Sequence, residues 1–180
     1  MSTAYLGLGS NVNARNNIAA SIAALRETFT EVRLSPAYRT EAIGFDGDDF
    51  INLTAAIKTR LQPIELKHFL NELEDRHGRL RNVPKFSDRT LDIDILLYDD
   101  LYLVSPQLQI PRREIMVFAH VLKPLADLAP HLVHPVCRKP LSEIWRDYTG
   151  DRQGLHETKL KEAAMRANLK QYLQLNHLNS

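Results

Sequence analysis

The chain has 180 residues, a length that suits one domain or one domain with a short appendage. Its 23 basic and 22 acidic residues give a formal net charge of +1, so the composition predicts no general affinity for polyanions and no nucleic-acid partner. The single cysteine, Cys137, excludes an internal disulfide and fits a reducing compartment. The N-terminus lacks a basic segment followed by a long apolar one, and no apolar run approaches ~20 residues. We therefore expect a cytoplasmic protein without a membrane span.

The first half of the chain alternates short β patterns with two helical ones. Proline is tolerated in the first turn of a helix, and glycine commonly follows the last turn, which sets both ends of the second helix. In chain order we expect a strand at Thr3–Leu8, a helix that carries Ile18, Ile22 and Leu25 and ends near Thr28, strands at Val32–Thr40 and Phe50–Thr59, and a helix from Pro63 to about Gly78.

Three further elements are predicted in the second half. Leu91–Leu96 and Leu101–Val104 have strand patterns, and Ile115–Leu128 has a helical pattern despite Pro124. The resulting order β-α-β-β-α-β is that of a ferredoxin-like α+β sandwich, here with added strands and a helix at the C-terminus.

The tail differs in character from the rest of the chain. Thr149–Gly154 is polar and carries two glycines, and Thr158–Leu175 is rich in Lys, Glu and Ala at loose helical spacing. We therefore expect a domain at residues 1–148, followed by a polar linker and C-terminal helical extension at residues 149–180. That helix could pack back on the domain or join two subunits, so the sequence leaves both a monomer and a dimer open.

Two aspartates in an apolar run are the most informative feature. From Leu91 to Leu96 polar and apolar residues alternate, so Asp92 and Asp94 share one face of the predicted strand. Neighbouring carboxylates repel each other unless a cation lies between them, and hard cations such as Mg²⁺ prefer oxygen ligands. The alternative is a solvated face of an edge strand. The pattern favours a metal site.

Three arginines precede these aspartates. Arg79, Arg81 and Arg89 lie within the sequence RLRNVPKFSDRTLDIDIL. Guanidinium groups are suited to bind phosphate oxygens, whereas a single arginine is more often a surface residue. Their clustering next to the carboxylate pair therefore predicts a site that holds a metal and a phosphate together.

Four blocks of the sequence resemble the 6-hydroxymethyl-7,8-dihydropterin pyrophosphokinases of folate biosynthesis, and they occur in that family's order. The resemblance covers about residues 3–148, which identifies this part as a pyrophosphokinase-like domain. The blocks are AYLGLGSN at Ala4–Asn11, YRTEAIG with DFINLTAAI in Tyr38–Ile57, ELEDRHGRLRNVPKFSDRTLDIDILLYD at Glu72–Asp99, and IPRREIMVFAHVLKPLADLAPHLVHP at Ile110–Pro135.

The resemblance implies transfer of the terminal pyrophosphoryl group of ATP to the pterin hydroxymethyl oxygen, with release of AMP. It implies two Mg²⁺ ions on Asp92 and Asp94, ATP as co-substrate, and Arg79 and Arg89 as catalytic residues beside the two aspartates. The implied pterin-binding residues are Thr40, Ile43, Phe50, Asn52, Phe86 and His120, and the implied nucleotide-binding residues are Glu74, Arg81, Arg89, Arg112 and Arg113.

The fourth block departs from the family pattern. The family usually has Pro-His and, further on, an arginine followed two residues later by phenylalanine, where this chain has Arg112, Phe118 and His120. Arg112 and Arg113 could supply the missing positive charge, with His120 stacking in place of the aromatic residue. Alternatively, the chain is a divergent relative that binds a pterin without catalysis, or one that acts on a different pterin or nucleotide. The intact aspartates and arginines favour an active enzyme with small-molecule substrates.

Overall fold

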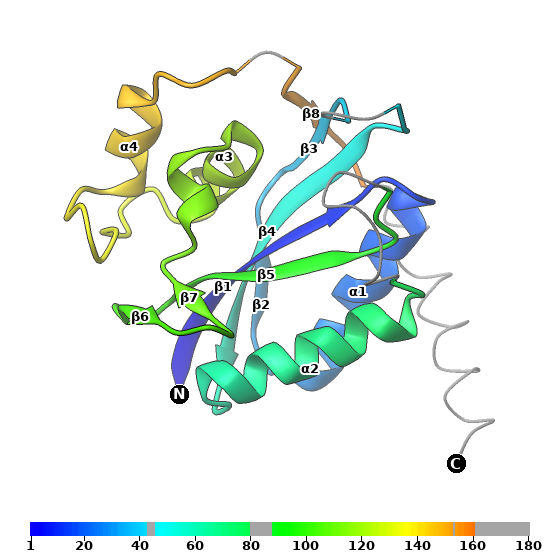
Figure 1. Cartoon of the computed structure of the whole chain (residues 1–180), viewed down its shortest axis with the longest axis horizontal. Coiled ribbons are helices and arrows are strands. Elements are labelled where there is room, and N and C mark those ends of the chain that lie inside the picture. The colour runs from blue at the N-terminus through cyan, green and yellow to red at the C-terminus, as the bar shows by residue number, and fades with distance from the viewer. Residues whose placement is uncertain (43–45, 80–87, 153, 161–180) are drawn as a thin grey trace.

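The structure, a computed structural model, describes residues 1–42, 46–79, 88–152 and 154–160, and a six-stranded antiparallel sheet runs through it (Figure 1). The strands of this sheet are β1 (Ser2–Ser10), β2 (Val32–Leu34), β3 (Ala37–Thr40), β4 (Phe50–Thr59), β5 (Asp92–Tyr98) and β8 (His156–Thr158). A separate hairpin pairs β6 (Leu103–Val104) with β7 (Gln109–Ile110). The helices are α1 (Ala14–Thr28), α2 (Pro63–Arg76), α3 (Ala119–Leu128) and α4 (Leu141–Asp147), and Arg113–Met116 form a 3₁₀ helix, η1.

The order of the strands confirms the ferredoxin-like α+β sandwich. The sheet runs β5-β1-β4-β3-β8, and β2 also pairs with β4. The two central strands, β1 and β4, pair over nine residues each, from Ser2 opposite Thr59 to Ser10 opposite Ile51. The sheet therefore ends at β5 on one side, and this edge strand carries the two aspartates.

Helices cover the two faces of the sheet in different ways. One face buries its apolar residues against α1 and α2, through side chains such as Leu6, Leu53, Ile22 and Leu70. The other face has a smaller apolar cluster, in which Ile115, Leu122 and Leu125 of η1 and α3 pack with α4 against the sheet. In Figure 1, α3 and α4 lie to one side of this second face. The part of the face that they leave open holds the candidate site.

The alternation predicted for the aspartate strand is confirmed. Leu91, Ile93 and Ile95 are buried in the cluster that includes α1 and α2, while Asp92 and Asp94 are partly exposed on the opposite face. Beyond them the register shifts, since Tyr5 pairs with Leu97 and Leu6 with Ile95. The extra residue, Leu96, is the bulge that ends the regular alternation.

One predicted strand is two strands in the structure, β2 and β3. The strand predicted at Val32–Thr40 is interrupted, because Leu34 pairs with Ala55 and Tyr38 with Asn52, which leaves one extra residue on this side. Pro36 lacks the N–H that a continuous ladder would need, and the Ser35 hydroxyl instead accepts the Thr54 N–H at 2.9 Å.

The helix predicted to begin at Ile115 begins at Ala119. The apolar spacing continues through η1, but Val117 and Phe118 separate this 3₁₀ turn from α3. Hydrophobic periodicity alone does not reveal the break between η1 and α3, because both segments bury apolar side chains in the same cluster.

Several short elements were not anticipated, namely α4, β7 and β8. β8 follows the predicted polar linker, includes the first residue of the predicted C-terminal helix, and pairs with β3, which places Thr158 opposite Ala37. The helix predicted at Thr158–Leu175 falls largely outside the described residues, so it stays a prediction together with the boundary at residue 148. No helix in the described ranges is long and apolar enough to span a membrane.

The connection between α3 and α4 is organised by a buried histidine. The Nδ1 atom of His134 accepts hydrogen bonds from the N–H groups of Val136 and Cys137 at 3.3 and 3.4 Å, and the backbone N–H of His134 donates to the carbonyl of Lys139 at 2.9 Å. The side chain is almost fully buried, and its burial lowers the pKa of His134 below the ordinary 6.5. Protonation of His134 at Nδ1 would also turn this acceptor into a donor, which would face the N–H groups of Val136 and Cys137.

The fold should therefore lose stability in acid through His134. Because the folded-state pKa lies below the unfolded one, the unfolded chain takes up the proton first as the pH falls through 6.5, and stability decreases below that pH. Urea unfolding at pH 7.5 and 5.5 should show a His134 contribution of up to about 1 kcal/mol. The variant His134→Asn, which keeps an acceptor and cannot titrate, should lose this part of the pH dependence. His68→Asn, at an exposed position of α2, is the matched control, and equal slopes in all three proteins would refute the assignment.

Candidate active site

A pocket of about 510 Å³ lies on the open part of the second sheet face. Its floor is formed by Gly7 and Gly9 of β1, which pair with the aspartate strand on one side and with β4 on the other. A Cβ atom on Gly9 would lie 3.1 Å from Oδ1 of Asn52, and one on Gly7 would lie 3.2 Å from a methyl group of Leu96. Side chains at these two positions would fill the floor, so the glycines keep the two halves of the pocket continuous.

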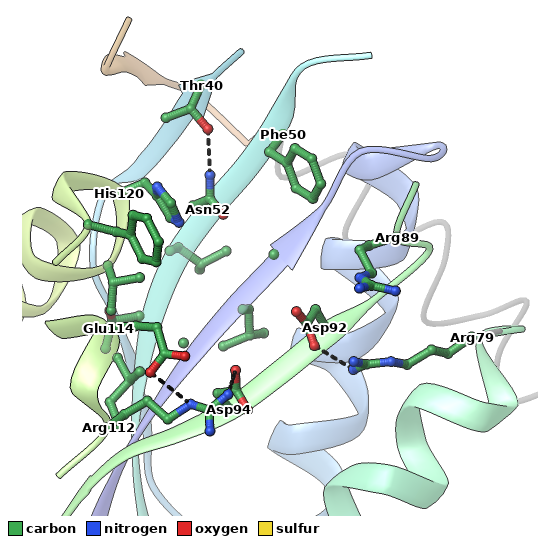
Figure 2. A pocket seen from close by; sticks show the side chains of 18 of the residues that line it. Thr40, Phe50, Asn52, Arg79, Arg89, Asp92, Asp94, Arg112, Glu114 and His120 are labelled. Carbon is green, nitrogen blue, oxygen red and sulfur yellow. Dashed lines mark hydrogen bonds and ion pairs between the residues drawn. The ribbon is translucent and has the colours of Figure 1, made fainter. Parts of the chain in front are cut away.

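One half of the pocket contains the two aspartates, whose side chains are 37% and 30% exposed for Asp92 and Asp94. Figure 2 shows both pointing into the pocket from the same strand. The Oδ1 atom of Asp92 accepts a hydrogen bond from Arg79 at 2.5 Å. Asp94 contacts Arg112 at 3.1 Å and Lys67 at 3.7 Å. The carboxylates are therefore neutralised by side chains from three separate segments.

A buried carboxylate positions the first of these cations. Glu74, near the end of α2, is completely buried and accepts the Ile93 N–H at 2.7 Å. It also accepts a hydrogen bond from Arg79, which thus joins Glu74 to Asp92. Because β5 is an edge strand, its outward N–H groups lack a neighbouring strand, and Glu74 satisfies one of them. The hydrogen bond between Glu74 and Arg79 also fixes the place where the Arg79 side chain passes the edge of the sheet to reach Asp92.

Burial acts on the pKa values of both Glu74 and Arg79. Burial raises the pKa of the Glu74 carboxyl above its ordinary value, and the Ile93 N–H and Arg79 oppose that rise. Burial acts to lower the pKa of Arg79, but the carboxylates of Asp92 and Glu74 outweigh it and raise that pKa above the ordinary value. Arg79 therefore keeps its charge.

The second arginine, Arg89, is positioned by the end of β1. The Oδ1 atom of Asn11 accepts the Arg89 N–H at 2.6 Å, and the Asn11 N–H donates to the Arg89 carbonyl at 3.0 Å. The Ser10 hydroxyl donates to the Thr90 carbonyl at 2.5 Å, and the Asn11 amide donates to Asp88 at 2.7 Å. Ser10 and Asn11 are both buried, so the short motif at the end of β1 anchors the backbone of Arg89.

The other half of the pocket is mainly uncharged, although Glu41, next to Thr40, also lines the pocket. Asn52, 8% exposed, donates from Nδ2 to the Thr40 hydroxyl at 2.9 Å. Phe50 stands at the start of the same strand, and His120 faces these residues from α3 (Figure 2). Phe118 stacks on His120 with ring centroids 5.2 Å apart and planes 20° from parallel. Burial lowers the pKa of His120, so the ring that faces Asn52 is neutral at pH 7.

A hydrogen bond outside the pocket sets the distance between its walls. The Tyr38 hydroxyl on β3 donates to Asp127 on α3 at 2.5 Å, and Lys123 forms an ion pair with the same carboxylate. Burial, together with the Asp127 contact, raises the pKa of Tyr38 well above its ordinary value, which keeps the hydroxyl protonated as a donor. This contact holds the helix of His120 against the strand of Thr40. Nothing in the sequence pattern pairs these two residues.

Comparison with known proteins places this arrangement in a family. Residues 5–130 match the family described as 7,8-dihydro-6-hydroxymethylpterin-pyrophosphokinase, HPPK. The chain belongs to this family. It is 36% identical over 146 residues to the 2-amino-4-hydroxy-6-hydroxymethyldihydropteridine pyrophosphokinase of Aquifex aeolicus, a match that covers 80% of this chain and 91% of that protein. The corresponding enzyme of Pseudomonas aeruginosa is 40% identical over 136 residues, with coverages of 73% and 83%.

Solved structures agree on the fold. The wild-type HPPK-DHPS of Plasmodium falciparum, solved with pteroate, superposes with a TM-score of 0.62 at 15% identity. The match covers 82% of this chain and 42% of that one, so this chain spans less than half of the larger protein. As a member of the HPPK family the chain is a diphosphotransferase of folate synthesis and acts on small-molecule substrates.

The pocket gathers most of the residues that the sequence singled out. Glu74 lies behind it, against Arg79, and Arg113 is exposed on η1 and does not line it. Ile43, Arg81 and Phe86 lie outside the described residues, so their roles stay predictions. The predicted residues in the pocket wall are Thr40, Phe50, Asn52, Arg79, Arg89, Asp92, Asp94, Arg112 and His120.

Sequence reasoning did not single out three charged residues in the wall, Glu41, Lys67 and Glu114. Lys67 lies seven residues before Glu74, two helical turns away on the same face of α2, and that spacing could have indicated it. Glu114 lies 3.4 Å from Nε of Arg112, and no periodic signal marks it because η1 is short.

Glu74 should be essential to the stability of the site. Glu74→Gln keeps an acceptor for the Ile93 N–H but removes the buried charge that Arg79 contacts, so we expect a loss of about 2–3 kcal/mol in the free energy of unfolding. Glu72→Gln, on the same helix, removes an exposed charge that lies 3.6 Å from Arg76, and should cost less than about 0.5 kcal/mol. Urea denaturation of both variants measures the difference. Equal losses would show that Glu74 does not act as a buried anchor.

Proposed function

We propose that this enzyme transfers pyrophosphate from ATP to the hydroxymethyl group of 6-hydroxymethyl-7,8-dihydropterin, with Mg²⁺, and releases AMP. The observation that carries the proposal is a single pocket whose two halves suit the two substrates. Carboxylates and arginines line one half, and an amide with aromatic rings lines the other, across a glycine floor. Relatives named for this pterin activity support it.

The uncharged half suits a pterin. The fused pyrimidine edge of a pterin presents both donors and acceptors, and the Asn52 amide has both. One Asn52 N–H is engaged by Thr40, which fixes the orientation of the amide and leaves Oδ1 to accept. Phe50 and His120 offer flat rings for stacking on the bicycle.

The chemistry of the donor set fits Mg²⁺. Asp92 and Asp94 supply carboxylate oxygens from one strand face, and both side chains open into the pocket, where phosphate oxygens and water could complete an octahedral shell. When bound there, two such ions would neutralise charge on the triphosphate and favour deprotonation of the attacking hydroxyl.

The arginines of the chain itself would bind and orient the phosphates. Pyrophosphoryl transfer depends on positioning and charge neutralisation rather than on a covalent enzyme intermediate. Arg79 is held by Glu74, and the backbone of Arg89 is held by Asn11, so both approach the pocket from fixed anchors. Arg112 enters from the opposite side, at the position where the family usually has histidine, and supplies a permanent positive charge.

AMP release by the purified protein with Mg²⁺ and ATP, with and without 6-hydroxymethyl-7,8-dihydropterin, tests the proposal. Pterin-dependent AMP supports it. Pterin binding without AMP would instead support the alternative of a binding protein, in which Arg112 does not replace the usual histidine. Faster turnover with a pterin of different side chain, or with another nucleotide, would support a changed specificity.

The aspartates should be essential for turnover but not for folding. Asp92→Asn and Asp94→Asn each remove one anionic oxygen from the proposed metal site, and we expect kcat to fall by about three orders of magnitude or more. Because both side chains are partly exposed, thermal unfolding should change little. A variant that retains wild-type turnover would contradict the metal assignment.

Asn52 should affect the pterin and not the nucleotide. Asn52→Leu keeps a similar volume and removes both hydrogen-bonding groups, so the KM for pterin should rise about tenfold or more. The KM for ATP, measured in the same preparations, serves as the internal control and should stay within about twofold. Parallel rises in both constants would point to general damage to the pocket.

A further inference from the structure

The two aspartates of the pocket are neutralised unequally. Among the residues that the structure describes, Asp92 forms an ion pair with one cation, Arg79, at its Oδ1 atom. Asp94 meets two: its Oδ1 atom lies 3.7 Å from Nζ of Lys67, and its Oδ2 atom lies 3.1 Å from Nη2 of Arg112. Both oxygens of Asp94 are thus occupied by cations from different elements, and Figure 2 shows Arg112 reaching it from the far wall.

The cation at Asp92 is permanently anchored. Arg79 also contacts Glu74, which is completely buried and is held in turn by the Ile93 N–H. Even if Asp92 were to turn to another partner, Arg79 would keep a buried counter-charge. Nothing therefore requires Arg79 to leave its place when the site fills.

The cations at Asp94 lack such an anchor. Within the described ranges, Lys67 forms one ion pair, and its partner is Asp94. Arg112 has a second carboxylate, Glu114, 3.4 Å from its Nε atom, but that nitrogen is buried without a hydrogen-bond acceptor. Donors of Arg112 therefore remain to be satisfied, and an anion that enters the pocket could satisfy them.

We propose that Lys67 and Arg112 are exchangeable counter-ions of Asp94, which move to phosphate oxygens when a nucleotide enters and so release Asp94 for its metal. The inference rests on the proposed function, because it takes Asp94 as a metal ligand. A metal that arrives alone must displace Lys67, and also Arg112, whose other carboxylate, Glu114, lies only at its Nε atom. A metal that arrives with a triphosphate brings an anion for both cations with it.

This arrangement couples metal binding to nucleotide binding. The triphosphate should raise the affinity for the metal, and by linkage the metal should raise the affinity for the triphosphate by the same factor. Lys67 and Arg112 become positioning residues for the phosphates, and their variants change that coupling rather than the metal ligands themselves. Asp92, whose cation stays with Glu74, should contribute little to the coupling.

Mn²⁺ binding to the full chain, measured by titration calorimetry and electron paramagnetic resonance, tests this without turnover. The metal is titrated alone and with α,β-methylene ATP, which is not cleaved at the reacting bond. The variants are Lys67→Gln and Arg112→Gln, with Lys67→Arg as the charge-conserving version. Arg76→Gln is the control, since it removes one cation from an exposed position of the same helix, where Arg76 pairs with Glu72.

We expect each neutral variant to bind Mn²⁺ alone about fivefold or more tightly than the wild type, because a competing charge 3.7 Å (Lys67) or 3.1 Å (Arg112) from Asp94 is gone. The enhancement of Mn²⁺ affinity by the nucleotide analogue should shrink in the same variants. Lys67→Arg and Arg76→Gln should match the wild type. Unchanged or weaker Mn²⁺ binding in both neutral variants overturns the proposal.

The result is independent of the activity assay. Absence of pterin-dependent AMP would refute the proposed function even if the metal coupling were present, and normal turnover with no coupling would refute the counter-ion role alone. Circular dichroism of each variant verifies that the fold is retained, so that a loss of binding is assigned to the site.

Discussion

The buried carboxylate of Glu74 is the contact on which the charged half of the site depends. It satisfies an N–H at the free edge of β5 and holds Arg79, and through Arg79 it reaches Asp92. A carboxylate without exposure is costly unless it is paired, so Glu74 depends on Arg79 and on the Ile93 N–H. Helix α2, the edge strand and the first arginine are thereby fixed relative to one another. The site can then be open to solvent on its other side without losing its geometry.

The uncharged half is held by a different principle. Here the sheet supplies Asn52 and Thr40, and a separate helix supplies His120, so the spacing of the walls depends on how α3 docks. The apolar cluster around Leu122 and Leu125 supplies most of the burial, and the Tyr38–Asp127 hydrogen bond sets the position along the strand. The glycines of β1 then allow the two halves to meet at one floor, because a side chain there would touch Asn52 or Leu96.

The sequence predicted those features that depend on local pattern. Alternation over six residues was enough to place Asp92 and Asp94 on one face, since the side-chain period of a strand is two. The break at Pro36 and the gap before Ala119 were missed because hydrophobic periodicity continues through both. The Lys67–Asp94 and Tyr38–Asp127 pairs join residues far apart in the chain, and a single sequence carries no signal for such contacts. Resemblance to a family indicated which residues matter, but not which cation neutralises which aspartate.

The altered fourth block changes the charge of the pocket more than its shape. Where the family usually has an imidazole, Arg112 has a guanidinium, which remains charged at every physiological pH. Where the family usually has an aromatic hydrocarbon, His120 has an imidazole that burial keeps neutral, stacked on Phe118. The titratable ring has thus moved from the phosphate side to the side proposed for the pterin. Charge on the phosphate side then no longer depends on a histidine.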